Sequence, residues 1–372
     1  MGRPRDTAVH DAAAYTARVL VPLRHRVRRL RRYASLAAPV LRSNVGRLRA
    51  PWKLTLATTY VCNHKCTHCG IWTRRPTGEM TTPDFAALFA ANPSLRWVDL
   101  TGGEPTARPD FPEIVAAASR LPHLLVLHFP TNGTLPAKAV AAARAATSPA
   151  KLLVTVSLDG PREVHDRIRG VDGAFDSAME TFVKLRRETD ATVVLGMTLT
   201  PDNADQVDAT FAAARAVVPD LPDEAFHFNV AQRSAHYYGN EEMPTAAPDA
   251  VLAALRAADQ PPRSPASLLE RAYRGLVADF LNSGASPVRC QSLSASCFVD
   301  PWGTVYPCIT EDRPLASLRE HGWSLASVWR ATQDAADDMA AGRCDGCWTP
   351  CEAYPSLLGS LGPAAAAAVA GP

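Results

Sequence analysis

Short apolar segments rich in β-branched residues alternate with segments of helical periodicity from residue 53 onward. The expected strands are at 53–59, 96–101, 124–130, 151–158, 192–199 and 225–230. The expected helices are at 82–91, 109–120, 136–146, 174–188 and 203–216. Nearly continuous apolar strands that alternate with helices are typical of a parallel sheet buried on both faces. Six such units predict an α/β fold, a partial (β/α)6 TIM-like barrel that is two units short of a complete one.

The chain is expected to divide into several parts. Residues 244–267 are rich in proline and alanine, which marks a connection after the barrel. The alanine-rich end of the chain has the low complexity of a frayed tail. The expected parts are a basic helical arm (1–50), the partial barrel (51–240), linker helices (241–285), a small cysteine-rich domain (286–358) and a disordered tail (359–372).

Composition and charge change this picture at the N-terminal end. Hydrophobic residues make up 47% of the chain, but no apolar run reaches the length of about 18 residues that a membrane-spanning helix needs. The start of the chain lacks the apolar segment of a secretion signal, so a cytoplasmic location is expected. The net charge is only +2, yet residues 1–53 hold twelve Arg and one Lys against Asp6 and Asp11, a local balance of +11.

The segment 18–49 carries much of this positive charge. Leu23, Val27 and Leu30 recur at helical spacing between arginines, and Pro39 is expected to divide the segment into two helices. Three interpretations stay open. The segment can lie on anionic lipid and make the protein membrane-associated, contact nucleic acid or an acidic protein partner, or pack as a solvated helix on the catalytic domain.

A cysteine motif follows the first expected strand, where Cys62, Cys66 and Cys69 have the spacing C-x3-C-x2-C. In a chain without an export signal, such a group indicates metal ligands rather than disulfides. Three thiolates on one loop can hold a [4Fe–4S] cluster and leave one iron open to a substrate or cosubstrate. The competing interpretation is a zinc site, which would need His64 or His68 as its fourth ligand.

This motif, placed after the first strand of a partial barrel, resembles that of the radical S-adenosylmethionine (radical SAM) superfamily. The resemblance covers about residues 53–230 and departs at His68, where the family usually has an aromatic residue. It implies an enzyme that reductively cleaves S-adenosylmethionine (SAM) at the cluster, with a reductant such as flavodoxin or ferredoxin. The resulting 5′-deoxyadenosyl radical would abstract a hydrogen atom from the substrate.

The same resemblance implies SAM-binding residues at the ends of the next strands. In DLTGGEPT, residues Gly102, Gly103 and Glu104 match the segment that holds the methionine amino group. The chemistry agrees, because glycines let the backbone approach a ligand closely and a carboxylate suits an ammonium group. The sequence therefore predicts that the end of the second strand contacts SAM.

Further SAM contacts are implied at the ends of the third and fourth strands. Ser157 and Asp159 match positions near the ribose and the methionine carboxylate. Arg169 can pair with that carboxylate, or can belong to the start of a solvated helix. Asn132 is expected to line the same cleft, or to serve only as a turn residue.

The second cysteine group lies near the C-terminus and contains Cys290, Cys297, Cys308, Cys344, Cys347 and Cys351. DPWG at 300–303 predicts a hairpin that brings Cys290 and Cys308 together. The spacing of Cys290, Gly303 and Cys308 resembles the SPASM domain, or its shorter twitch form, which binds auxiliary [4Fe–4S] clusters in radical SAM enzymes. It implies one auxiliary cluster, with Cys290, Cys308, Cys344 and Cys347 as the preferred ligands.

Alternatives stay open for this second group. Cys351 can replace one of the preferred ligands, while Cys297 is also a ligand candidate but fits plain core packing on a strand. A closed zinc site is the competing interpretation of the four thiolates.

The favoured reaction is the oxidation (dehydrogenation) of a polar small molecule or sugar-like substrate, with the auxiliary cluster as electron acceptor. Polar residues that can face this substrate follow the sixth strand, and they are Gln232, Arg233, Ser234, His236 and Tyr237. The same segment can instead be an ordinary connector whose tyrosines pack in the protein. The alternatives within the family are a peptide maturase that catalyses crosslinking or epimerisation, and a dehydratase. A zinc-binding interaction module is the alternative from a different class.

Overall fold

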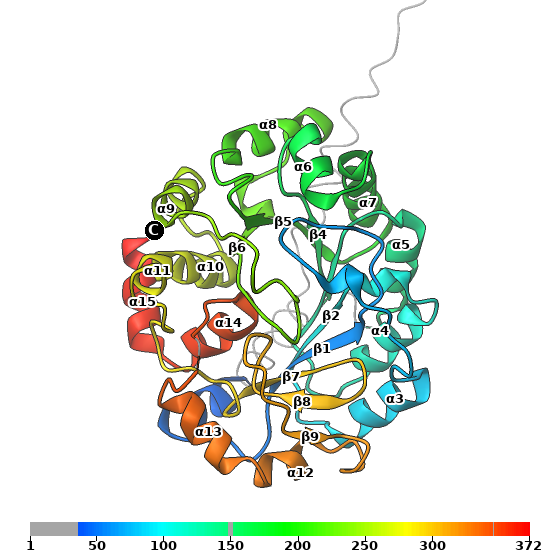
Figure 1. The fold of residues 1–372 in the computed structure, drawn as a ribbon, viewed down its shortest axis with the longest axis vertical. Coiled ribbons are helices and arrows are strands. Elements are labelled where there is room, and N and C mark those ends of the chain that lie inside the picture. The colour runs from blue at the N-terminus through cyan, green and yellow to red at the C-terminus, as the bar shows by residue number, and fades with distance from the viewer. Residues whose placement is uncertain (1–35, 148–151, 345) are drawn as a thin grey trace, which may run out of the picture.

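The computed structural model describes residues 36–147, 152–344 and 346–372, which form one nine-stranded sheet with helices around it (Figure 1). The strand order is β6-β5-β4-β3-β2-β1-β7-β8-β9, and neighbours from β1 to β6 are parallel. These six strands are β1 (Lys53–Thr59), β2 (Trp97–Gly102), β3 (Val126–Thr131), β4 (Leu152–Ser157), β5 (Thr192–Leu199) and β6 (Phe226–Val230). All six predicted strands are present, and the partial barrel predicted from the sequence is confirmed.

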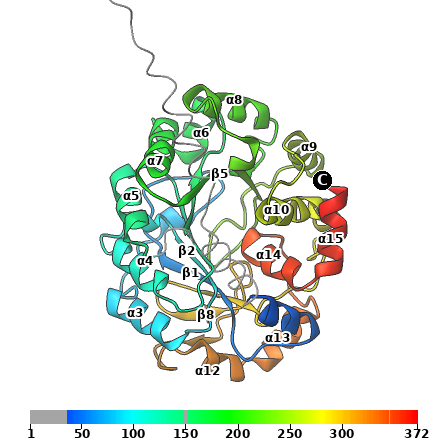
Figure 2. The same cartoon turned by 180° about the vertical axis from the view of Figure 1, so that it is seen from behind.

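Helices surround the parallel strands, and both views show them as an outer ring (Figures 1 and 2). They are α3 (Thr82–Ala91), α4 (Phe111–Ser119), α5 (Pro136–Ala145), α6 (Arg162–Arg169), α7 (Ala174–Glu188) and α8 (Val207–Val217), with short helices η1 (Ile71–Thr73), η2 (Pro105–Ala107) and η4 (Asp223–Ala225). Only α6 lies outside the predicted set of α-helices. Its sequence REVHDRIR is mostly charged, and it ends at Gly170, whose φ of 62° suits a glycine.

The C-terminal part continues the sheet of the barrel. Its elements are α9 (Pro248–Ala257), α10 (Pro265–Gly275), α11 (Val277–Ser283), β7 (Ser296–Val299), β8 (Thr304–Tyr306), β9 (Ala316–Ser317), α12 (Leu325–Arg330), α13 (Gln333–Ala340), α14 (Pro350–Leu358) and α15 (Leu361–Ala370). Strand β7 pairs parallel with β1, and β7 to β9 pair antiparallel. Gly303, at φ 88°, lies in the predicted turn between β7 and β8.

Helix α14 lies on the open side of the partial barrel, between β6 and β7 (Figure 1). Its Tyr354 ring stacks on Trp97 of β2 at a centroid distance of 6.0 Å and lies 6.1 Å from the His227 ring of β6. The Tyr354 hydroxyl also donates to Glu270 of α10. The helix therefore contacts both the edge strand β6 and the strand β2 near the other edge of the six-stranded unit.

The end of the chain differs from the disordered tail expected for 359–372. Residues 361–370 form α15, and Ala367 and Ala368 are buried. Arg271 of α10 donates to the Ala368 carbonyl oxygen at 2.9 Å. Alanine has the highest helix propensity, so a low-complexity alanine run forms a helix once a neighbour covers one of its faces.

The described part of the basic arm packs against the barrel. Residues 36–45 are helical, and Val40 lies in an apolar cluster with Trp52 and Ala295. The Arg47 side chain donates to the Leu293 carbonyl oxygen at 2.8 Å, and Figure 2 shows the helix (blue) beside α13. These contacts agree with the third interpretation of the arm for residues 36–49, while residues 18–35 lie outside the described part. Among the described residues, no helix is long and apolar enough to cross a membrane.

A buried ion pair lies inside the barrel, between Lys53 and Asp99. The Lys53 ammonium is 2.8 Å from the Asp99 carboxylate, and His128 Nδ1 is 3.2 Å from the same group. Burial alone would raise the pKa of Asp99, but the charge of Lys53 and the contact with His128 hold it well below its usual range. Burial would likewise lower the pKa of Lys53, yet Asp99, with a smaller effect of other nearby acidic groups such as Glu352, raises it to about 12.

Candidate active site

The three cysteines of the first motif lie on the loop after β1, here called the cysteine loop (residues 60–70). This loop runs beside the end of β2, where the Gly103 N–H donates to the Thr59 carbonyl oxygen at 2.7 Å. A Cβ atom on Gly103 would lie 2.3 Å from the Val61 carbonyl oxygen, and one on Gly102 would lie 2.2 Å from that of Thr59. The two glycines therefore allow close packing of the two segments, and their predicted contact with SAM stays a prediction.

The C-terminal end of α6 contacts the other side of the cysteine loop. The Lys65 N–H donates to the Arg169 carbonyl oxygen at 3.0 Å, and the Thr67 N–H donates to that of Ile168 at 2.9 Å. The last carbonyl groups of a helix have no partner within the helix, so the loop satisfies two of them. The helix that the sequence did not predict thus helps to hold the cysteine motif.

Arg169 connects this helix to the cysteines. Its guanidinium lies 2.6 Å from the Asp159 carboxylate and donates to the Cys66 sulfur at 3.7 Å. Burial alone would raise the pKa of Asp159, but the Arg169 charge and the other favourable contacts, among them the Thr198 N–H, together lower it. Because Arg169 is only 8% exposed, its assignment to a solvated helix start is wrong.

Glu104 joins the ends of β2 and β3. It is almost fully buried, and its Oε1 accepts from the N–H and hydroxyl of Thr106 and from the Thr131 hydroxyl. Its Oε2 accepts from the Asn132 N–H at 2.7 Å, which leaves acceptor capacity for one further donor such as an ammonium group. The Asn132 side chain donates to Asn63 in the cysteine loop at 2.7 Å, so the predicted residues Glu104 and Asn132 lie together beside the cysteines.

Ser157 lies at the end of β4, opposite Gly196 of β5. Two residues that no sequence motif pointed to hold the neighbouring Asp159. His165 Nδ1 accepts from the Asp159 N–H at 2.9 Å, and the Asn203 side chain donates to the Asp159 carbonyl oxygen at 2.9 Å. Burial lowers the pKa of His165 to about 4, so its ring is neutral at pH 7. His165 lies in α6 and Asn203 in the turn after β5, so two separate elements hold Asp159.

The chemistry of the cysteine loop fits an iron–sulfur cluster. Burial raises the pKa of Cys62 to about 11 and that of Cys69 to about 12, and it also raises that of Cys66. Only thiolates bind metal, so the charge of the bound group has to compensate for their burial. The described residues contain no group of three His, Cys, Asp or Glu side chains arranged around one ion. A cubane cluster binds each thiolate through a different iron, so three thiolates on one loop suit a cluster.

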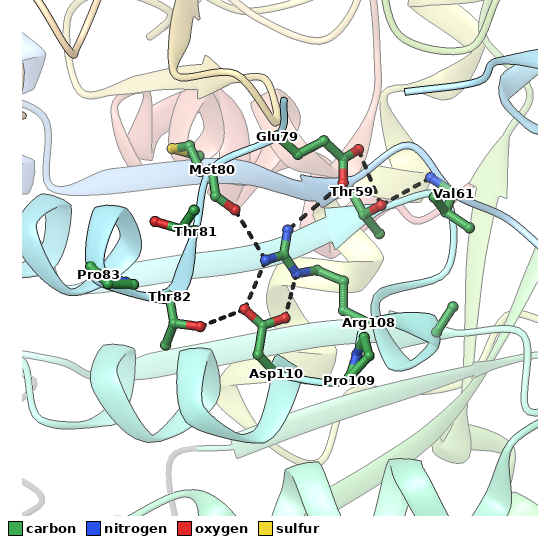
Figure 3. Close-up of a pocket in the computed structure, with 11 residues that line it drawn as sticks. Thr59, Val61, Glu79, Met80, Thr81, Thr82, Pro83, Arg108, Pro109 and Asp110 are labelled. Atoms are coloured by element: carbon green, nitrogen blue, oxygen red, sulfur yellow. Dashed lines mark hydrogen bonds and ion pairs between the residues drawn. The ribbon is translucent and has the colours of Figure 1, made fainter. Parts of the chain in front are cut away.

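A pocket with a volume of about 490 Å³ lies beside the start of the cysteine loop (Figure 3). Arg108 contacts both carboxylate oxygens of Asp110 at 2.8 Å and donates to the Thr58 carbonyl oxygen at 2.8 Å. Glu79 accepts from the Tyr60 N–H at 2.7 Å. None of the predicted SAM contacts lines this pocket. Its charged residues Arg108 and Glu79 bind backbone groups at the end of β1 and the start of the cysteine loop.

Four C-terminal cysteines lie together. The Cys308 thiol forms a hydrogen bond with the Cys347 thiol. Burial raises the pKa of the Cys290 thiol, and the nearby Cys308 and Cys344 raise it further. The Ser292 hydroxyl donates to the carbonyl oxygen of the residue before Cys308 at 2.6 Å, which closes the hairpin as the sequence predicted. The structure thus brings together the four preferred ligand candidates, whose role as ligands stays a prediction.

The other two C-terminal cysteines point elsewhere. Cys297 is fully buried on β7, where it lies opposite Leu54 of β1. Cys351, on α14, interacts with the Thr55 hydroxyl of β1. The surroundings of Cys297 agree with core packing.

Residues 232–240, here called the connecting segment, follow β6. Ser234 and His236 contact backbone carbonyl groups near Cys308, and the Tyr237 hydroxyl contacts the Thr101 hydroxyl at 2.8 Å. Two interpretations of these polar groups were open: they face a substrate, or they belong to a connector that packs in the protein. In the structure they are occupied by contacts within the protein, because the segment lies between the two cysteine groups.

Comparison with known proteins identifies the class that this fold and cysteine loop define. Residues 56–214 match the Radical SAM superfamily. The chain is 31% identical to the mycofactocin maturase MftC of Mycobacterium ulcerans (strain Agy99) over 336 residues. This alignment covers 84% of this chain and 86% of the relative. Over 327 residues it is 27% identical to the AdoMet-dependent heme synthase of Methanosarcina barkeri (strain Fusaro / DSM 804), covering 82% and 89%. The chain belongs to the radical SAM superfamily and is an enzyme that uses SAM and a [4Fe–4S] cluster.

The fold agrees with a solved structure of the same kind. Native anSMEcpe with bound AdoMet and the Kp18Cys peptide superposes with a TM-score of 0.53 at 18% identity, covering 76% of this chain and 82% of that one. The family and the fold expected from the sequence are therefore confirmed. The alternative of a zinc-binding interaction module finds no support.

Proposed function

We propose that the protein is a radical SAM enzyme that modifies a peptide and uses one auxiliary [4Fe–4S] cluster. The auxiliary cluster would be held by Cys290, Cys308, Cys344 and Cys347. The observation that carries the proposal is that these four thiols lie together, on hairpin and loop segments joined by the connecting segment to the cysteine loop.

The residues around the cysteine loop would bind SAM. Cys62, Cys66 and Cys69 hold the catalytic cluster, which when bound supplies the electron that cleaves SAM to a 5′-deoxyadenosyl radical. The free acceptor capacity of Glu104 Oε2 suits the methionine amino group. Arg169, fixed by Asp159, presents a positive charge to the methionine carboxylate.

A peptide is favoured over a sugar-like substrate for two reasons. The polar groups of Ser234, His236 and Tyr237, which favoured a sugar, are engaged with the protein itself. The 31% identical relative is a maturase, and a structure with the same fold contains a bound peptide. The second reason is an analogy between proteins, and it makes a peptide the first substrate class to test.

An auxiliary cluster would supply an acceptor for the electron that remains on the substrate after hydrogen abstraction. This makes net oxidation of the peptide, such as formation of a new bond with loss of two hydrogens, the proposed outcome. Cys308 and Ile309 are buried, which shields the Cys308 side of such a centre from water, whereas Cys344 is exposed.

The cluster assignment is tested by anaerobic reconstitution followed by iron analysis and 5′-deoxyadenosine assays. The wild type should bind about eight irons per chain, and Cys66→Ala should keep about four and form no 5′-deoxyadenosine with dithionite and SAM. Cys297→Ala is the matched control and should keep both clusters. Zinc in place of iron, or 5′-deoxyadenosine formation by Cys66→Ala, would contradict the assignment.

The substrate class is tested with two panels of candidates, one of peptides and one of polyols and amino sugars. Mass spectrometry should show loss of two hydrogens from a peptide, in step with formation of 5′-deoxyadenosine. Turnover of the sugar panel alone would overturn the peptide assignment and leave the cluster assignment intact.

A further inference from the structure

The connecting segment binds the backbone of the cysteine loop at its C-terminal end. The Gly70 N–H, directly after Cys69, donates to the Tyr238 carbonyl oxygen at 2.7 Å. The Asn240 side chain donates to the His68 carbonyl oxygen at 3.0 Å. A Cβ atom on Gly70 would lie 2.3 Å from the Gly239 carbonyl oxygen, so the cysteine loop and the connecting segment are in close contact.

The same segment binds the backbone around Cys308. His236 Nε2 lies 3.1 Å from the Cys308 carbonyl oxygen, so this nitrogen carries the proton and donates. The Ser234 hydroxyl donates to the Ile309 carbonyl oxygen at 2.5 Å. The His236 ring also stacks on Tyr306 of β8, at a centroid distance of 4.5 Å and an angle of 21°.

Internal hydrogen bonds make the segment a compact turn. The Ser234 N–H donates to the Asn240 side chain at 2.9 Å, and the Gly239 N–H donates to the Ser234 carbonyl oxygen at 2.7 Å. The Tyr237 N–H donates to the Ser234 hydroxyl at 3.1 Å. Ser234 and Asn240 are both at most 5% exposed, so these bonds are shielded from water. Movement at one end of the turn is therefore transmitted to the other.

We propose that Ser234 and His236 are positioning residues that fix Cys308, and with it the auxiliary cluster, relative to the cysteine loop. The inference rests on the proposed ligand role of Cys308. The Ser234 and His236 side chains bind the carbonyl groups of Ile309 and Cys308, shortly after β8. At most six residues further along the connecting segment, Tyr238 and Asn240 bind the backbone of Gly70 and His68. Loss of either donor leaves a buried carbonyl without a partner and frees Cys308 to shift.

The test compares variants that separate the donor from the ring. His236→Phe keeps an aromatic ring against Tyr306 and removes the donor, whereas His236→Gln keeps a donor and removes the ring. Ser234→Ala removes the second donor. His321→Gln, at a side chain whose Nδ1 lies 3.2 Å from the Ser327 hydroxyl, is the matched control.

The readouts are iron per chain, the electron paramagnetic resonance (EPR) spectrum of the auxiliary cluster and the magnetic interaction between the two reduced clusters. His236→Phe and Ser234→Ala should lose at least half of the auxiliary iron, or show a changed auxiliary spectrum and at least a twofold change in the interaction. His236→Gln and His321→Gln should resemble the wild type. The SAM-induced change in the spectrum of the first cluster should persist in all four.

The outcomes separate this inference from the proposed function. If the wild type carries no auxiliary cluster, the proposed function fails. If the wild type carries it and His236→Phe and Ser234→Ala match His321→Gln, the positioning role alone is overturned. Equal losses in the Phe and Gln variants also overturn the donor role of His236, since the ring would then be what matters. Should His236→Phe fail to fold, Ser234→Ala decides the result.

Discussion

Arg169 and Asp159 form an ion pair with a nitrogen–oxygen distance of 2.6 Å, and their side chains are only 9% and 0% exposed. Removing one partner of a buried pair leaves the other charge without compensation. Asp159→Asn should therefore lower the free energy of unfolding of the apoprotein by about 3–5 kcal/mol in urea denaturation. The double variant with Arg169→Gln should lose less than the sum of the two single changes.

The control for this cycle is the exposed pair Arg144–Glu188, whose side chains are 60% and 40% exposed. Solvent screens such a pair, so Glu188→Gln should cost less than about 1 kcal/mol. Equal losses at the buried and exposed pairs would show that Asp159 and Arg169 do not depend on each other.

Gly103→Ala should disturb the cysteine loop without a change in charge. The added Cβ would lie 2.3 Å from the Val61 carbonyl oxygen and 3.0 Å from the Cys62 Cβ, so the loop has to move away from β2. We expect at least a twofold loss of iron from the first cluster, with the auxiliary iron retained, measured by iron analysis and EPR.

Gly46→Ala is the matched control, because a Cβ atom there meets nothing within 4 Å. It should bind iron as the wild type does. Full iron binding by Gly103→Ala would show that the loop tolerates the shift and that this glycine is not needed for close approach.

The Lys53–Asp99 pair should make stability depend on pH at both ends of the scale. The pKa of Asp99 is lower in the folded protein than its usual value of about 3.9, so its contribution is present above that value and is lost as the pH falls through the folded pKa. The pKa of Lys53 is about 12, so its contribution is present below the usual value of about 10.4 and is lost as the pH approaches 12. The measurement is the free energy of unfolding against pH.

The double variant Lys53→Met/Asp99→Asn removes both titrating groups. Its unfolding free energy should fall less steeply than that of the wild type below about pH 4 and above about pH 10. Identical slopes in the two proteins would assign the pH dependence to other groups.

The barrel strands could be predicted because each is an apolar run between turn signals, and β1 and β5 match their predicted ranges. Helix α6 was expected only as the possible start of a solvated helix, because its charged sequence hides the contacts of its C-terminal end with the cysteine loop. The tail was mispredicted because alanine content alone does not show that α10 covers α15.

The site divides in a similar way. Cysteine spacing is local and could be read from the chain, whereas the bonds from Tyr238 and Asn240 to the cysteine loop join backbone groups far apart in the sequence. Backbone carbonyl groups carry no residue-specific signal. The sequence therefore left open whether Ser234 and His236 bind a substrate, whereas in the structure their partners are the carbonyl groups of Ile309 and Cys308.

Strand β7 lies in parallel register beside β1, with Lys53 opposite Ser296 and Leu56 opposite Val299. The C-terminal hairpin therefore protects the flank of the first barrel strand, and a shortened chain that ends before β7 would expose a row of unpaired N–H and C=O groups there. Such an open flank invites association with other chains. The partial barrel and the C-terminal region are consequently not interchangeable modules. A family member with a different C-terminal region would need another strand or loop to pair with its first strand.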